Sequence, residues 1–425
     1  MNRFPLEQRH VDQAKDLYTL RSRLLARHMT SIHSVMDLER RLAVHLSVLA
    51  QLAKADFSAT GKDAERFLYF ATKLQTDDRE RLLDTCVAAL EQVLEGNLNE
   101  QPVYDAFALY PPPTDLLFEL YKKMPKSGLF LFKYWRQQRT ELPPSLVNQA
   151  ELQNEDPLLQ REALFYAANR PAYGNEIFRA YYQPFLNSIT HISLPEAVWE
   201  PALWGGLVRG DADAELALRR AVELASSTEV RMRLLRLMAL NGSPDHQPVL
   251  LEAFERTPQF DTRWWALTGH SASASHLIEA LGQPERADSA HDDWHFLTGT
   301  FLPKRPALML VNEQGKTVEP DSEHKGEVKM VPDSHFAQAW WEAHQASWAQ
   351  QRWVMGQPDD IDWLYRLCRD YTGRLLDDLM DLLALKLQRP IAARSYSGWQ
   401  FLRLQELQQS ADKHPTSSPS VALSV

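Results

Sequence analysis

The sequence predicts an all-α protein whose middle is a solenoid of stacked helix pairs, with a helical region on either side. Three observations predict this class. Apolar residues recur every three or four positions along most of the chain, as amphipathic helices require. Capping residues and glycines mark helix starts and ends, and similar helix openings recur about every 32 residues, which indicates a repeat array.

The composition limits the partners of this 425-residue chain. Its 46 basic and 56 acidic side chains give a net charge of −10, which disfavours nucleic acid and anionic lipid surfaces. No apolar run approaches the ~20 residues of a membrane span, and residues 1–10 lack the apolar core of a signal peptide. We therefore expect a cytoplasmic protein without a membrane span. Cys86 and Cys368 form no CxxC motif, and we interpret both as small buried hydrophobes.

Residues 1–150 are expected to form an N-terminal helical region. A leucine stripe over residues 34–55 and a second over residues 83–94 have helical spacing. Three consecutive prolines at 111–113 stop the pattern before it resumes.

Residues 151–285 are expected to form HEAT-like repeats, each made of a capped helix, a break and a second helix. Asp156 is a capping residue followed by proline, and residues 226–229 offer a capping box. Breaks in this unit are expected at Gly205 and Gly206 and again at Gly210.

The repeat period supports stacking of these units. Arg231 and Arg263 are 32 residues apart, and Leu203, Leu234 and Leu267 are 31 and 33 apart. Each helix pair leaves one apolar face uncovered, so burial requires the neighbouring pair.

The remaining chain divides into three predicted parts. Residues 286–335 contain several prolines and glycines and a short β-like run at 307–311, so we expect a connector with at most a small hairpin. Residues 336–408 resume helical spacing and form a predicted C-terminal helical region. The Ser/Pro-rich tail, residues 409–425, is predicted to be disordered.

Tryptophans and arginines supply the candidate protein-binding residues. Nine of the twelve tryptophans lie beyond residue 260, and indole rings often anchor interfaces. The candidates are Arg231, Arg263, Trp264, Trp265, Trp340 and Trp341. Two alternatives stay open: the tryptophans at helical spacing pack in the core, and the arginines at one register bond between neighbouring repeats.

The sequence offers no anchor for catalysis, a metal or a cofactor. GxxxxGK[ST], GxGxxG and GxSxG are all missing. Asp377, Asp378 and Asp381 have the DDxxD form of a magnesium motif, but no second motif has matching spacing, so we interpret them as a solvated acidic face. His291 and His295 lie four residues apart, as zinc ligands on a helix can, and we interpret them as a structural or surface pair.

Five segments carry a resemblance that spans most of the chain, namely residues 38–46, 263–271, 339–344, 356–358 and 396–400. In this order they resemble an uncharacterised bacterial family of HEAT-like repeat proteins associated with type VI secretion gene clusters. The resemblance implies a helical solenoid and an accessory role in that secretion machine. Its partner would then be a secretion-system component or effector. The family supplies no catalytic residues to transfer.

These observations favour a non-enzymatic protein-binding adaptor or scaffold. One alternative is a HEAT-like enzyme, either a DNA glycosylase using Asp261 beside Trp264 and Trp265, or a metal enzyme. The acidic net charge opposes the glycosylase, and no histidine is followed by glutamate as in HEAT-type di-iron hydroxylases. Self-association into a homo-oligomer is a third possibility.

Overall fold

The computed structural model describes residues 4–411, except 53–56, 97, 139–141, 143–151, 153, 188–191, 257–260, 307–329, 349–350 and 392–397. Helices take 73% of the described residues, which confirms the all-α prediction. None of the described helices combines the length and apolar character needed to cross a membrane.

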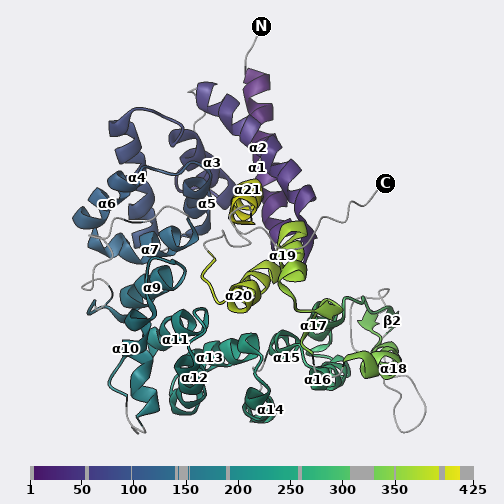
Figure 1. The fold of residues 1–425 in the computed structure, drawn as a ribbon. Coiled ribbons are helices and arrows are strands. Elements are labelled where there is room, and N and C mark those ends of the chain that lie inside the picture. Colours follow the sequence, from purple (N-terminus) through teal and green to yellow (C-terminus); the bar gives the residue numbers. More distant parts are fainter. Residues whose placement is uncertain are drawn as a thin grey trace, which may run out of the picture. The chain divides into compact units, whose positions relative to one another are not determined.

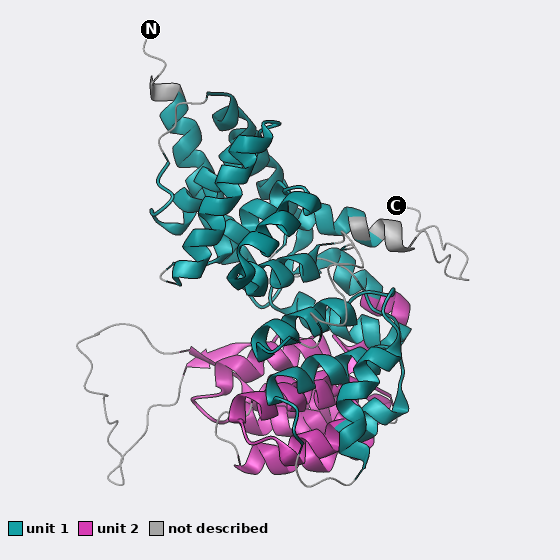
Figure 2. Ribbon diagram, turned by 90° about the vertical axis from the view of Figure 1, so that its left-hand side faces the viewer, with its two compact units in different colours: residues 1–217, 365–425 teal, residues 218–364 magenta. Residues whose placement is uncertain are grey.

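Contacts divide the chain into two compact units (Figure 2). Unit 1 comprises residues 1–217 and 365–425, and unit 2 comprises residues 218–364. The predicted boundaries near residues 150, 285, 335 and 408 are not tested by this division and stay predictions.

Unit 1 is helical apart from one short ladder, in which β1 (Thr30–Ser31) pairs antiparallel with β6 (Tyr371–Thr372). Its helices are α1 (Phe4–Leu25), α2 (Ile32–Leu52), α3 (Asp63–Lys73), α4 (Arg79–Glu95), α5 (Gln101–Leu109), α6 (Thr114–Lys123), η1 (Pro125–Ser127), α7 (Gly128–Gln137), α9 (Pro157–Ala168), α10 (Asn175–Leu186), η2 (Glu196–Val198), α11 (Trp199–Leu207), α20 (Leu375–Leu387) and α21 (Gln400–Ala411). Helix α1 packs along α2, and α9 packs on both α7 and α11 (Figure 1).

Unit 2 contains the remaining helices and two short antiparallel pairs, β2 (Lys304–Pro306) with β3 (Met330–Pro332) and β4 (Trp353–Val354) with β5 (Gln357–Pro358). Its helices are α13 (Thr228–Asn241), η3 (Pro244–His246), α14 (Gln247–Arg256), α15 (Arg263–Thr268), α16 (Ser271–Leu281), α17 (Ala287–Thr298), α18 (Ser334–His344) and η4 (Gln345–Trp348). Helices α12 (Ala212–Leu224) and α19 (Ile361–Asp370) contain the boundaries between the units. Helix α15 packs on α13, α16 and α17.

Capping residues set helix ends at or within one residue of the predicted positions, with Ser227 as the cap where the sequence predicts a box from Ser226 to Glu229. The Asp156 carboxylate accepts a hydrogen bond from the backbone N–H of residue 158, and the Ser227 hydroxyl accepts one from residue 230. Gly242 then ends α13 in a left-handed conformation, with φ of 65°.

The predicted break at Gly205 and Gly206 is wrong, because both residues lie inside α11. A Cβ at Gly205 would lie 2.3 Å from the ring of Phe178, so this glycine permits close packing of α10 on α11. The predicted break at Gly210 is confirmed, because the chain turns there with φ of 70°.

The predicted connector begins with a helix, since α17 occupies residues 287–298. Ala290 and Trp294 are fully buried and four residues apart, the spacing of one face of a helix. The prolines of this segment led to the prediction of a connector in its place. The β2–β3 hairpin follows, while the β-like run at 307–311 lies outside the described residues. Helix α21 extends to Ala411, and residues 412–425 of the predicted tail also lie outside them.

Buried arginines bind the carbonyl groups at several helix C-termini. Arg170 donates to the carbonyls of Trp135 and Gln138 at the end of α7. Arg209 lies 39 residues after Arg170 in the sequence. It donates to the carbonyls of Ala167 and Ala168 at the end of α9. A guanidinium group placed there satisfies carbonyls that the helix leaves without partners and complements the negative end of the helix dipole.

A second arginine contact of this kind organises unit 2. Arg352 donates to the carbonyl of Ala239 near the end of α13 and to that of Leu267 near the end of α15. One side chain therefore ties α13 and α15 together.

A buried charged cluster in unit 1 consists of Tyr18, Arg21, Glu39 and Asp105. Arg21 Nε donates to Glu39 over 2.8 Å, and Arg21 Nη1 lies 3.5 Å from Asp105 Oδ2. The Tyr18 hydroxyl donates to the same Asp105 oxygen over 2.8 Å. Burial raises the pKa of both carboxyl groups, and the charge of Arg21 opposes that shift.

The charged cluster holds the start of α21. Glu39 Oε2 accepts the backbone N–H groups of residues 400 and 401, so a buried carboxylate caps this helix. Trp399 is fully buried, lies 4.3 Å beneath the Arg21 guanidinium and donates its Nε1–H to the backbone carbonyl of Asp105. The N-terminal helices and the C-terminal helix of unit 1 therefore share one core.

Candidate protein-interaction site

All six residues predicted to bind a partner lie in unit 2. Arg231 lies on α13, Arg263, Trp264 and Trp265 lie on α15, and Trp340 and Trp341 lie on α18. Trp264, Trp265 and Trp341 are only 6%, 2% and 6% exposed, so they contribute to the core. Arg231 is exposed and Trp340 is half-buried, and these two keep side-chain surface that a partner could contact.

Arg263 makes its main contacts within the protein. Its guanidinium lies 3.3 Å from the buried Asp293 carboxylate on α17 and 4.0 Å from the ring centre of Phe296. This contact between α15 and α17 fits the predicted alternative in which repeated arginines bond between neighbouring repeats. Arg231 differs, because its Nε donates to the backbone carbonyl of Val222. The shared register of the two arginines therefore does not produce the same contact.

The arrangement predicted for a glycosylase is not open to a base. The Trp265 ring stacks on His276 with ring centres 4.2 Å apart, and Trp264 is buried beside it. Asp261 accepts the backbone N–H of Arg263 over 3.0 Å at the start of α15. These three residues thus form a helix start and part of the core, and no observation favours the glycosylase.

An aromatic layer in unit 2 consists of Trp294, Trp341, Trp348 and Trp353. The Trp348 ring stacks on Trp353 at 4.6 Å and meets the edge of Trp341 at 5.3 Å. Trp340 contacts both Trp294 and Trp348 edge-on, at 5.6 and 6.2 Å. Such edge-to-face contacts add to the area buried and fix ring orientations, so the layer gives α18 a rigid support.

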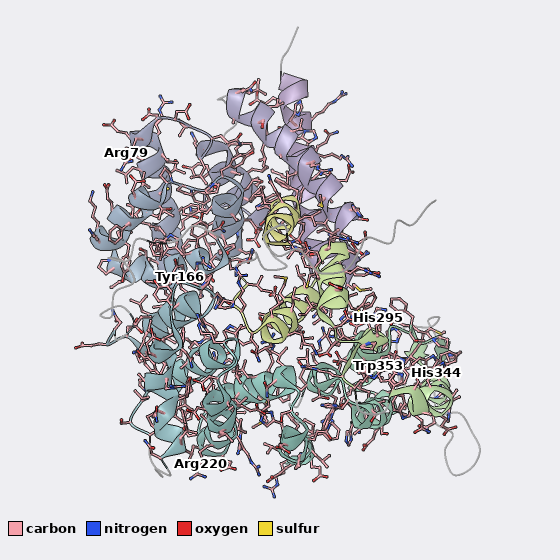
Figure 3. All side chains as sticks on the ribbon, viewed as in Figure 1. Arg79, Tyr166, Arg220, His295, His344 and Trp353 are labelled. Carbon is pink, nitrogen blue, oxygen red and sulfur yellow. The ribbon has the colours of Figure 1, made fainter. Side chains whose placement is uncertain are left out.

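The outer side of α18 carries an aromatic stripe formed by Phe336, Trp340 and His344. The three residues are four positions apart and share one helix face. Phe336 is 41% exposed, and the exposed His344 ring stacks on the half-buried Trp340 at 4.1 Å. Figure 3 labels His344 and Trp353 in this part of unit 2. The four-residue spacing is visible in the sequence, but the exposure of the stripe is not.

The β2–β3 hairpin adds two further exposed apolar side chains. Asp333 donates its backbone N–H to Pro303 over 2.9 Å, which continues the antiparallel pairing to the start of α18. Phe301, 65% exposed, therefore lies near the N-terminal end of α18 and stacks on His295 at 3.8 Å. Met330 on β3 is 45% exposed. No sequence pattern indicated these two residues, because only the strand pairing places them there.

We define the interaction surface as Phe301, Met330, Phe336, Trp340 and His344. Exposed large apolar side chains beside a rigid aromatic support are typical of sites that bind proteins.

The predicted metal motifs occupy structural positions. His295 is 2% exposed, and burial, followed by the charges of His291 and Arg263, lowers its pKa to about 4. Asp378 on α20 is 9% exposed, so its interpretation as part of a solvated face is wrong. Within the described part of the chain, no three His, Cys, Asp or Glu side chains converge as a metal site would require.

The two cysteines behave as predicted. Cys86 and Cys368 are buried and form no disulfide, and burial raises the pKa of each thiol to about 12.

Comparison with protein-family models, curated proteins and solved structures found no match. Two of the five segments that carry the resemblance contact each other in unit 1, and two more contact other distant parts of the chain in unit 2. In unit 1, Glu39 of the first segment binds the backbone of the last segment at Gln400. In unit 2, the carbonyl of Gly269 accepts the N–H of Trp353, and Gly356 donates its N–H to the carbonyl of Leu297. The segments thus mark places where distant parts of the chain contact each other.

Proposed function

We propose that this protein is a non-enzymatic adaptor whose helix pairs form a HEAT-like array and whose interaction surface binds a protein partner. The single observation that carries the proposal is the exposed aromatic stripe on α18 above the buried aromatic layer. A rigid aromatic surface binds without the entropy cost of ordering long flexible side chains. The stripe and Phe301 together supply the aromatic anchors that dominate binding energy in protein interfaces.

The HEAT-like part of the proposal is supported by helix packing and by the arginine contacts. In unit 1, α9 packs on both α7 and α11, and in unit 2, α15 packs on both α13 and α17. Arg170, which follows α9, binds a carbonyl at the end of α7, and Arg209, which follows α11, binds one at the end of α9. A contact repeated between neighbouring layers is what a stack of similar units requires.

The partner that we propose is a component or effector of a type VI secretion system. The resemblance of the five segments to the secretion-associated family supports this choice. The net charge of −10 supports a protein partner over a nucleic acid.

Affinity capture tests the proposal. The full-length protein is immobilised and exposed to lysate from a bacterium with an active secretion locus, and bound proteins are identified by mass spectrometry. We expect a secretion component to bind, and Phe336→Ala or Trp340→Ala to reduce its recovery at least about tenfold, because aromatic anchors contribute most of the binding energy. Leu216→Ala is the matched control, since Leu216 is 66% exposed but lies in unit 1 on α12.

Two outcomes would contradict the proposal. Recovery of the same component by the stripe variants would exclude the interaction surface as the binding site. Failure to recover any secretion component would remove the proposed partner.

A further inference from the structure

Two histidines from different helices of unit 1 meet within the α1–α2 pair. His10 lies on α1 and His45 on α2, and both side chains are half-buried. Their Nδ1 atoms are 2.8 Å apart, and the ring centres are 5.0 Å apart with the planes tilted by 59°. The two nitrogens therefore point at each other head-on, which is the geometry of an N–H···N hydrogen bond. One Nδ1 donates its proton to this bond and the other accepts it.

This geometry limits the number of protons that the two rings can hold. A first added proton binds the Nε2 of the donor ring, so the hydrogen bond persists and becomes charge-assisted. A second added proton has to bind the accepting Nδ1, because the Nε2 of that ring already carries one. Two N–H groups would then face each other across 2.8 Å on two positively charged rings, so the rings must separate.

We propose that His10 and His45 form a pH switch that holds the N-terminal turns of α1 on α2 and releases them when the pair binds a second added proton. Histidine is the side chain whose ordinary titration range lies between about pH 5 and 8, so moderate acidity is sufficient to act on the pair. Release brings buried apolar side chains of both helices into water, among them Val11, Ala14 and Leu46. The switch is independent of the interaction surface, which belongs to unit 2.

Charged neighbours on the two helices act in different directions. Arg41 lies one turn before His45 on α2, and burial, followed by the charges of His10 and Arg41, lowers the pKa of His45. Glu7 lies one turn before His10 on α1 and attracts positive charge to that helix. His45 is therefore the ring that resists the second added proton.

Besides each other, α1 and α2 pack chiefly on α3, α21 and β1. Glu65 of α3 is bound by Lys15 of α1 over 2.7 Å, and Asp63 and Arg66 of α3 pair with each other. Arg403 of α21 donates to backbone carbonyl groups, and β1 has no charged residue. The Lys15–Glu65 ion pair also joins α1 to α3 five residues after the first histidine, so we expect the released segment to end there.

Nuclear magnetic resonance of the histidine side chains tests the proton count in the unchanged full-length protein. Long-range ¹H–¹⁵N spectra recorded from about pH 8 to about pH 4 report the protons on each ring. We expect the pair to titrate in two separate steps, because the first proton hinders the second. His33, an exposed residue of α2, should titrate in one step. A single step shared by His10 and His45 would overturn the proposal.

Hydrogen exchange tests whether the second step releases α1. Protection factors, which correct for the intrinsic pH dependence of exchange, should fall at least about tenfold at residues 7–14 as the pH passes through this step. His10→Asn and His45→Asn each leave only one titrating ring, so protection should persist to the same low pH. His33→Asn is the matched control and should lose protection as the unchanged protein does. Constant protection of residues 7–14 through the second step, or an equal loss in the His10 and His45 variants, would show that the pair is no switch.

Discussion

The charged cluster of unit 1 and the aromatic layer of unit 2 both join parts of the chain that lie far apart in sequence, but they use different interactions. In unit 1, Arg21 and Glu39 bind residues 398–401 through a buried ion pair and hydrogen bonds. In unit 2, Trp348 joins Trp341 to Trp353 through ring contacts. Removing one member of a buried polar contact leaves its partner unsatisfied at a cost of about 1–3 kcal/mol, whereas removing a ring forfeits many weak contacts that add up.

The two regions also differ in what they present to solvent. The four members of the charged cluster are all buried, and so is Trp399 against them. The aromatic layer continues outward through the half-buried Trp340 to Phe336, which is 41% exposed. The charged cluster is wholly buried, so we expect it to contribute to stability. The aromatic layer ends in exposed apolar side chains, which are typical of a surface that binds another protein. Substitutions should therefore separate the two roles.

The largest effect is expected at Trp399, because its ring joins the charged cluster to α21. Trp399→Ala should lower the free energy of unfolding of unit 1 by about 3–5 kcal/mol, the cost of truncating a buried tryptophan. Urea unfolding followed by circular dichroism measures this loss. Trp340→Ala is the comparison, and a loss as large as that of Trp399→Ala would refute the distinction between a buried and an exposed region.

The next effect is expected at Arg352, which binds the ends of both α13 and α15. Arg352→Met keeps the aliphatic stem but leaves the carbonyls of Ala239 and Leu267 without this donor. We expect a loss of about 2–4 kcal/mol from two partly buried hydrogen bonds to a charged group. Hydrogen exchange should show faster exchange at the last turns of α13 and α15. Protection that stays unchanged at both helix ends would contradict the capping role.

A smaller, pH-dependent effect on stability is expected from His295 and Asp293, two buried residues of α17 whose pKa values shift in opposite directions. Burial lowers the pKa of His295 to about 4 and raises that of Asp293 to about 6, although Arg263 opposes the latter shift. As pH falls from about 6 to 4, only the unfolded state protonates His295, which lowers stability, and only the folded state protonates Asp293, which raises it. The two contributions oppose each other in the unchanged protein.

Single substitutions should reveal these slopes. In His295→Phe, the stability of unit 2 should rise as pH falls through this window, and in Asp293→Asn it should fall. Each change should amount to at most about 3 kcal/mol, since one pKa unit corresponds to about 1.4 kcal/mol. Thermal unfolding at several pH values measures both slopes, and slopes of the same sign would show that the assigned shifts are wrong.

Local sequence signals predicted helix ends well but could not predict contacts between distant segments. Asp156 and Ser227 cap helices as expected, because a cap depends on residues only two or three positions away. The binding of Glu39 to Gln400 spans 361 residues, and no periodic pattern encodes it. The same limit applies to the candidate site. The stripe residue Trp340 was predicted, but Phe301 required the strand pairing that places it near α18.

The smallest effect on stability is expected at the interaction surface itself. Phe301→Ser and Phe336→Ser remove side chains that are 65% and 41% exposed, so each should change the free energy of unfolding by less than about 0.5–1 kcal/mol. Differential scanning calorimetry measures this change beside that of Trp399→Ala. Because stability is retained, any loss of partner capture by Phe336→Ser reports the binding surface and not the fold. A large destabilisation by either change would mean that these phenylalanines belong to the core of unit 2. That result would contradict the assignment of the interaction surface as a binding site.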